Sequence, residues 1–233
     1  MPSLPLLFDF DHVPFSRAGR FLTLSMMDVP GKDGIGALYL RHVAGGDERP
    51  SLGRLCRVEF LDENGLPLAA TFDLSPACLV ARAGDGRAEF AIGEGETLHF
   101  RGAGLSVRFH LEGSRYDYVY QPPHGGHCLV AAVENVKIIP LSVEGDLDVT
   151  GTWQRDHSER VTMTFSGGAG FEGHLTLFRT IAPEPSAVRF EEARAGAGRE
   201  FDAWLSGLPQ ALARQEDAHR LASYLLWANR VPA

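Results

Sequence analysis

Short runs in which apolar and polar residues alternate recur along most of this chain, and they restrict its fold more than any other feature. In the clearest run, residues 105–112 (LSVRFHLE), every second side chain is apolar. Similar runs cover residues 22–26, 54–61 and 161–165. Because successive side chains of a β-strand point to opposite faces, this period of two predicts half-buried strands. The chain is therefore predicted to be mainly β.

Turn-forming residues separate these runs at intervals of about 8–15 residues. Asn64-Gly65 is a strong hairpin signal, and Gly167 to Gly170 turn the chain before a run predicted to be a strand over residues 171–181. About twelve to fourteen such runs precede residue 186, with no convincing helix among them. This pattern predicts a large antiparallel β-sandwich over residues 1–185.

Two finer expectations concern the strands. Residues 128–140 are long and apolar, and are predicted to form one central strand covered on both faces. Tyr116, Tyr118 and Tyr120 share one face of a strand, and we expect their rings to pack in the core or between layers.

The pattern changes after residue 186, and a helical region is predicted over residues 186–233. Apolar residues recur at helical spacing from Phe201 to Leu208, so residues 200–206 should be helical. Gly207 is well placed to end this helix, and Pro209 can begin the next.

The second helix is apolar on nearly all sides, which is typical of a buried helix. One stripe contains Ala218, Leu221, Ala222, Leu225 and Ala228, and another contains Tyr224, Trp227 and Val231. Since few residues follow Ala228, we expect this helix to pack against a larger body, with Leu221, Tyr224, Leu225 and Trp227 at the interface.

Composition excludes several classes of function. The formal net charge of −8 argues against a nucleic-acid or anionic-membrane surface. No N-terminal stretch resembles a signal peptide, and no apolar run approaches the roughly 20 residues of a membrane span. Cys56, Cys78 and Cys128 are odd in number and lie in apolar surroundings, which indicates free thiols in a reducing compartment. We therefore expect a cytoplasmic protein, and no residue pattern indicates a cofactor.

Two motifs and this layout resemble a known group of enzymes. Residues 13–22 (VPFSRAGRFL) resemble the "PFSR-x-G-x-(aromatic)-L" opening of bacterial six-hairpin glycosidases related to glucosidase I and mannosylglycerate hydrolase. Residues 221–227 (LASYLLW) resemble the first barrel helix of the same group. The resemblance implies a supersandwich of the galactose-mutarotase-like kind, a linker helix and the first helix of an (α/α)6 catalytic barrel.

The stretches that carry the catalytic carboxylates of that group have no counterpart here. Glycoside hydrolysis generally needs two carboxyl groups flanking the sugar, and no catalytic residue can be assigned to this chain. The resemblance implies a non-catalytic N-terminal domain that packs against the barrel of its parent enzyme. That enzyme would hydrolyse α-glycosidic bonds in small glycosides, and the domain could lend a loop to the active-site rim.

Five residues are candidates for the substrate rim or the domain interface: Ser16, Arg17, His124, His127 and Trp153. Ser16 and Arg17 could instead satisfy backbone groups and a carboxylate. The two histidines and Cys128 could ligate a metal, but no second Cys/His pair is near in sequence, and we predict no metal site. Trp153 could stack on a sugar or anchor two layers.

Other functions stay open. A free-standing carbohydrate-binding sandwich would bury both faces of the last helix within the chain. An aldose-epimerase-like enzyme would need a histidine and a carboxylate from separate strands of one sheet; His110 or His174 could serve, and the sequence selects no partner. A structural role would predict self-association through the apolar helix.

Overall fold

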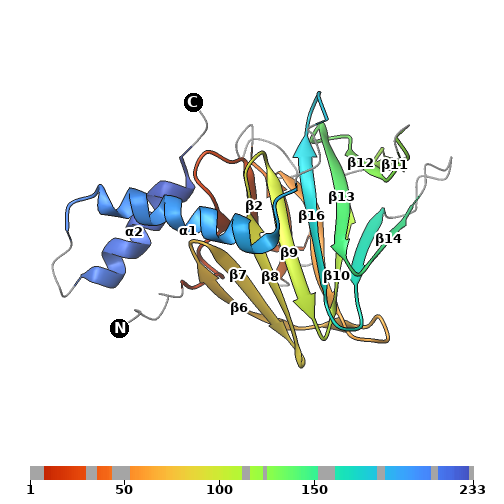
Figure 1. Cartoon of the computed structure of the whole chain (residues 1–233), viewed down its shortest axis with the longest axis horizontal. Helices are drawn as coiled ribbons and strands as arrows, with labels where there is room; N and C mark the ends of the chain where they lie inside the picture. Colours follow the sequence, from red (N-terminus) through yellow and green to blue (C-terminus); the bar gives the residue numbers. More distant parts are fainter. Residues whose placement is uncertain are drawn as a thin grey trace.

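The computed structural model describes residues 8–29, 36–43, 53–111, 116–122, 125–151, 161–182, 187–210 and 215–230. Within these ranges the chain forms two antiparallel eight-stranded sheets and two helices. The predicted β-sandwich is confirmed (Figure 1).

The first sheet has the strand order β1-β2-β3-β4-β10-β15-β14, and β5 pairs with β4. Its strands are β1 (Phe15–Ser16), β2 (Leu22–Asp28), β3 (Gly36–His42), β4 (Arg54–Leu61), β5 (Pro67–Leu68), β10 (Ser106–Leu111), β14 (Asp146–Thr150) and β15 (Thr162–Ser166). The predicted alternation at residues 54–61 and 105–111 thus falls on neighbouring strands, with Val58 opposite Phe109.

The second sheet has the order β11-β12-β13-β16-β9-β8-β7-β6. Its strands are β6 (Ala70–Ser75), β7 (Cys78–Ala83), β8 (Gly86–Ile92), β9 (Thr97–Ala103), β11 (Tyr118–Tyr120), β12 (Cys128–Ala131), β13 (Val136–Glu144) and β16 (Phe171–Phe178). The predicted last strand ends at Phe178, earlier than expected.

The core lies between the sheets and is rich in phenylalanine. Phe100 on β9 lies at its centre, with its ring 4.6 Å from that of Phe165 and 5.2 Å from that of Phe109, measured between centroids. Gly102 makes room for another ring, since a Cβ atom there would lie 2.5 Å from the ring of Phe171. All three cysteines are free and buried, as predicted.

Two strand predictions were wrong. Residues 128–140 form a hairpin of β12 and β13, because Asn135 adopts a positive φ of 51° and its N–H bonds to the carbonyl of Ala132 (3.3 Å). Asparagine tolerates this left-handed conformation, so the chain turns inside an apolar run. The tyrosines are not in the core: β11 is the edge strand of its sheet, and Tyr116 and Tyr120 are 56% and 40% exposed.

Helix α1 (Phe190–Ser206) begins ten residues before the predicted start, with Glu191 and Glu192 in its first turn. Acidic side chains are favourable there because the helix dipole is positive at that end. Gly207 ends α1, as predicted. The helix crosses the outer face of the second sheet over β8 and β9 (Figure 1).

Helix α2 (Glu216–Ala228) lies beside α1 (Figure 1). In the described part of the chain, no helix has the length and apolar character needed to cross a membrane.

Candidate functional site

The segment before β2 forms the seam between the sandwich and the helices. Tyr224 on α2 is fully buried, and its hydroxyl accepts a hydrogen bond from the Ser16 N–H (3.1 Å) and donates one to the Pro14 carbonyl (3.0 Å). Its ring stacks on that of Phe8 with centroids 5.0 Å apart. Burial raises the pKa of Tyr224, so the hydroxyl stays neutral and can act as both donor and acceptor. Residues 13–22 and 221–227, the two motifs that resemble the glycosidase group, are far apart in sequence and are in contact in the structure.

Arg17 fastens the same segment to α1. Its guanidinium makes a bidentate ion pair with Glu200 and donates a further hydrogen bond to the Ile92 carbonyl (2.9 Å). The side chain of Arg17 is 3% exposed, and its hydrogen bonds lower the pKa of Glu200. Arg17 therefore bonds a backbone carbonyl and a carboxylate, which was one of the two roles predicted for it. The carboxylate belongs to Glu200 in the helical region.

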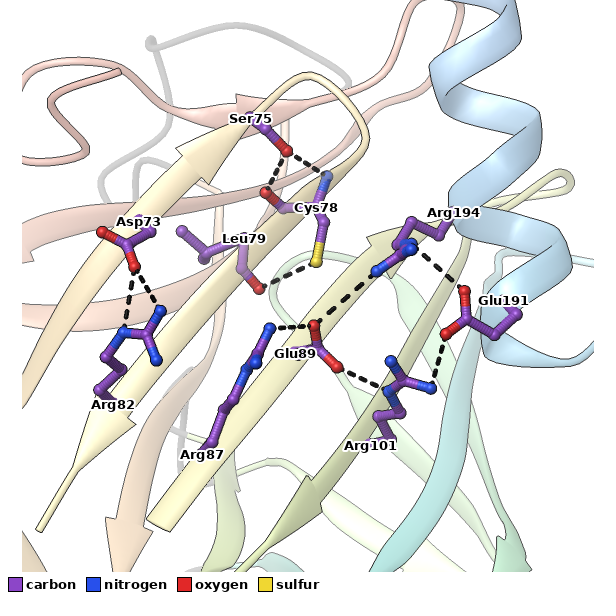
Figure 2. Close-up of polar contacts among 10 residues, drawn as sticks. All are labelled: Asp73, Ser75, Cys78, Leu79, Arg82, Arg87, Glu89, Arg101, Glu191 and Arg194. Atoms are coloured by element: carbon purple, nitrogen blue, oxygen red, sulfur yellow. Dashed lines mark hydrogen bonds and ion pairs between the residues drawn. The ribbon is translucent and has the colours of Figure 1, made fainter. Parts of the chain in front are cut away.

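The N-terminal half of α1 is fixed by a second ionic cluster (Figure 2). Glu89 on β8 is 8% exposed and pairs with Arg87 (2.6 Å) and Arg101 (2.7 Å). Arg101 in turn pairs with Glu191 of α1 (2.8 Å).

An apolar contact lies beside this cluster. Phe190 of α1 packs against Cys78 and Ala91 on the sheet. Burial raises the pKa of the Cys78 thiol to about 12, so it is an unreactive packing group. Every charge drawn in Figure 2 has a partner, and the pairs of Glu89, Arg101 and Glu191 join α1 to the sheet.

Helix α2 has two unlike apolar faces. Tyr224 and Trp227 are 0% and 2% exposed, and both rings contact Phe201 of α1. Leu221 and Leu225 are half-buried against the core. Of the four residues predicted to meet a barrel, Tyr224 and Trp227 are thus covered by their own chain, and Leu221 and Leu225 are partly covered by it.

The outer face of α2 carries a separate apolar stripe. Ala218, Ala222 and Leu226 follow one another at intervals of four residues and are exposed, with Leu226 at 64%. Together with Leu208 and Pro209 they line a groove of about 580 Å³. Leu226 is the large apolar side chain of this exposed face.

The remaining predicted site residues are His127, His124 and Trp153. His127 is half-buried before β12, whereas His124 and Trp153 lie outside the described residues. Among the described residues, no group of three or more His, Cys, Asp or Glu side chains is arranged to hold a metal ion.

The structure contains two close pairs that involve histidine and that the sequence did not predict: His110 with Glu59, and His99 with His174. On the outer face of the first sheet, His110 Nε2 lies 2.5 Å from Glu59 Oε2, and this hydrogen bond lowers the pKa of Glu59. Among the residues that the structure describes, buried His110 Nδ1 has no hydrogen-bond partner. Strand register could have suggested this pair, because β4 and β10 both alternate and the two residues share the polar face.

On the second sheet, the rings of His99 and His174 lie 5.4 Å apart, and each residue is 2% exposed. Burial, with the nearby positive charges of His174 and Arg17, lowers the pKa of His99 to about 4. Burial also lowers the pKa of His174.

The Tyr224→Phe variant should test the seam. It removes one hydroxyl and leaves the Ser16 N–H and the Pro14 carbonyl buried without their partner. We expect the free energy of unfolding to fall by about 1–3 kcal/mol in urea denaturation. Tyr116→Phe, on an exposed tyrosine, should change it by less than about 0.5 kcal/mol. Equal effects would show that the seam hydroxyl is not a stabilising contact.

Acid should destabilise the chain through His99. A folded-state pKa of about 4 lies below the unfolded value of about 6.5, so the unfolded chain binds the proton first as pH falls. Stability is complete above pH 6.5, and about 2 kcal/mol should be lost from this group by pH 5. Urea denaturation across this range should show a smaller loss for His99→Gln. His12→Gln, on a histidine with an 81% exposed side chain, should behave as the wild type; an unchanged slope for His99→Gln would contradict the prediction.

Comparisons with known proteins assign no family to the chain. No protein-family model matches the sequence, and a search of curated proteins finds no match either. Its function must be inferred from the seam, the open face of α2 and the histidine–carboxylate pair.

Proposed function

We propose that this chain is the N-terminal β-sandwich region of a cytoplasmic, bacterial-type six-hairpin glycoside hydrolase. It would hold the (α/α)6 catalytic barrel and contribute no catalytic residue of its own. The observation that carries the proposal is the division of α2 into an anchored face and an open apolar face.

The anchored face supports the proposal because it fixes the orientation of α2. Tyr224 and Trp227 bury large aromatic rings against the sandwich side, and Arg17 and Glu200 hold α1 in the same joint. A helix fixed in this way is a preformed docking element, so a partner need not supply the energy to order it.

The open face suits another helix. Ala218, Ala222 and Leu226 form an i, i+4, i+8 ridge, and such ridges pack into the grooves of a neighbouring helix. The small alanines allow close approach, and Leu226 projects as a knob. Exposed apolar patches of this kind usually mark interaction sites.

The groove itself does not have the chemistry of a glycosidase site. None of the described residues that line it is acidic, whereas hydrolysis generally needs two carboxyl groups on opposite sides of the sugar. This favours a non-catalytic role for the chain, in which the barrel of the parent enzyme carries out the reaction.

The docking proposal is tested with the (α/α)6 barrel of a bacterial six-hairpin glycosidase from which its own sandwich has been removed. Calorimetry should show binding of the wild-type chain and at least roughly tenfold weaker binding of Leu226→Asp, a loss of about 1.4 kcal/mol. Leu66→Asp is the matched control, since Leu66 is 62% exposed on a turn far from α2 in sequence.

Absence of binding by the wild-type chain, or equal binding by Leu226→Asp, would contradict the proposal. Sedimentation of the chain alone distinguishes the self-association hypothesis. Dimers that Leu226→Asp dissociates would assign the open face to a second copy of this chain instead.

A second candidate function is favoured by the Glu59–His110 pair. The two residues come from adjacent strands of one sheet, the arrangement that an epimerase-like enzyme needs. One group could remove the proton of the anomeric hydroxyl while the other protonates the ring oxygen, which opens an aldose for epimerisation.

Polarimetry of freshly dissolved α-glucose and α-galactose tests this candidate. If it is correct, the chain accelerates mutarotation, and Glu59→Gln and His110→Asn each reduce the rate at least roughly 100-fold. His12→Asn is the control, because His12 forms an exposed pair with Asp9 (2.8 Å). No acceleration by the wild-type chain excludes the candidate.

A further inference from the structure

A separate cavity of about 280 Å³ lies between the turn that precedes β2 and the C-terminal end of α2. A main-chain hydrogen bond from the Gly19 N–H to the Arg230 carbonyl (2.8 Å) joins its two walls. The groove on the outer face of α2 shares none of its lining residues. The cavity is therefore a second feature, independent of the proposed docking face.

The lining of the cavity is basic. Arg20, Arg41 and Arg230 contribute to it, and none of its described lining residues is acidic. This contrasts with a chain whose 30 acidic residues outnumber its 22 basic ones. The local excess of positive charge favours an anionic ligand.

Two of these arginines keep hydrogen-bonding capacity. Arg20 donates to the main-chain oxygens of Gly19 (3.0 Å) and Gly93 (3.4 Å). Arg230 lies over the ring of Trp204, with its guanidinium carbon 5.1 Å from the centroid, and within the described part of the chain it makes no ion pair. Arg41 makes an interaction of its own.

Two carboxylates near Arg20 already have hydrogen-bond partners. Glu96 accepts hydrogen bonds from the N–H groups of Phe21 and Leu22, and Glu200 is held by Arg17, so both carboxylates near Arg20 are already bonded. The C-terminus of α2 adds roughly half a negative charge. Asn229 partly offsets this, since its backbone and side-chain N–H groups both bond the Leu225 carbonyl.

We propose that this cavity binds a small phosphate monoester. Arg20, on the turn before β2, and Arg230, after α2, both line the cavity. A tetrahedral phosphate offers three strong acceptor oxygens to donors from several directions, whereas a carboxylate offers one planar edge. Phe21, Pro14 and Val43 supply an apolar wall for the organic part of the ligand. The volume is near the lower limit of about 300 Å³ for small-molecule sites, which fits one ring and its phosphate.

Calorimetry on the full chain at low salt tests the site with three probes: phenyl phosphate, inorganic phosphate and benzoate. We expect phenyl phosphate to bind most tightly, inorganic phosphate more weakly and benzoate least. Arg230→Gln and Arg20→Gln should each weaken phenyl phosphate roughly tenfold, because each removes a charge-assisted hydrogen bond. Phe21→Ala should weaken phenyl phosphate and leave inorganic phosphate unchanged.

Arg82→Gln is the matched control, since Arg82 is an exposed arginine on β7 that pairs with Asp73 (3.0 Å). Circular dichroism melting of each variant shows that it is folded. The proposal is overturned if phenyl phosphate does not bind, if benzoate binds as tightly, or if the folded arginine variants bind unchanged. Equal affinity for the two phosphates, with no effect of Phe21→Ala, would reject the organic ligand and leave free phosphate as the occupant. No barrel is present in these titrations, so their outcome is separate from that of the docking experiment.

Discussion

Burial of the Tyr224 hydroxyl against Pro14 and Ser16 is the contact on which the arrangement of the two regions depends. A buried tyrosine must place both its ring and its hydroxyl, and here the ring meets Phe8 and Phe201 while the hydroxyl bonds the backbone of the N-terminal segment. That segment in turn positions Arg17, which reaches across to Glu200 on α1. A few directional polar contacts, surrounded by apolar side chains, therefore fix the position of the helices on the sandwich.

The strands could largely be predicted from sequence, because one face of each is apolar and the alternation states which one. The pattern failed where a strand has no simple two-sided environment. Tyr116, Tyr118 and Tyr120 alternate like a buried face, but they lie on or beside an edge strand, where only Val119 reaches the core. Periodicity reports which residues share a face, and strand order decides whether that face is covered.

The seam residues were partly predictable, and their partners were not. A motif drew attention to Ser16 and Arg17. Their partners Tyr224 and Glu200 lie 208 and 183 residues further along the chain, and no sequence pattern indicated them. Such pairings depend on how α1 crosses the sheet. The apolar excess of α2 was also visible, but the sequence did not show which side chains of α2 the chain covers itself. Tyr224 and Trp227 were predicted to meet a partner, but they are buried within the chain. Ala218, Ala222 and Leu226 are exposed to solvent instead.

The burial of the two aromatic residues of α2 has a physical cause. Large aromatic rings gain the most free energy from burial. The N-terminal segment provides the ring of Phe8 and two backbone hydrogen-bond partners for Tyr224. Tyr224 is therefore buried within the chain itself. The residues left outside are alanines and a leucine, whose side chains carry no polar atom. A face of this composition is tolerable without a partner and favourable with one, because its association costs no disruption of the seam. The packing of the two helices on the sandwich thus leaves a preformed apolar ridge exposed on α2.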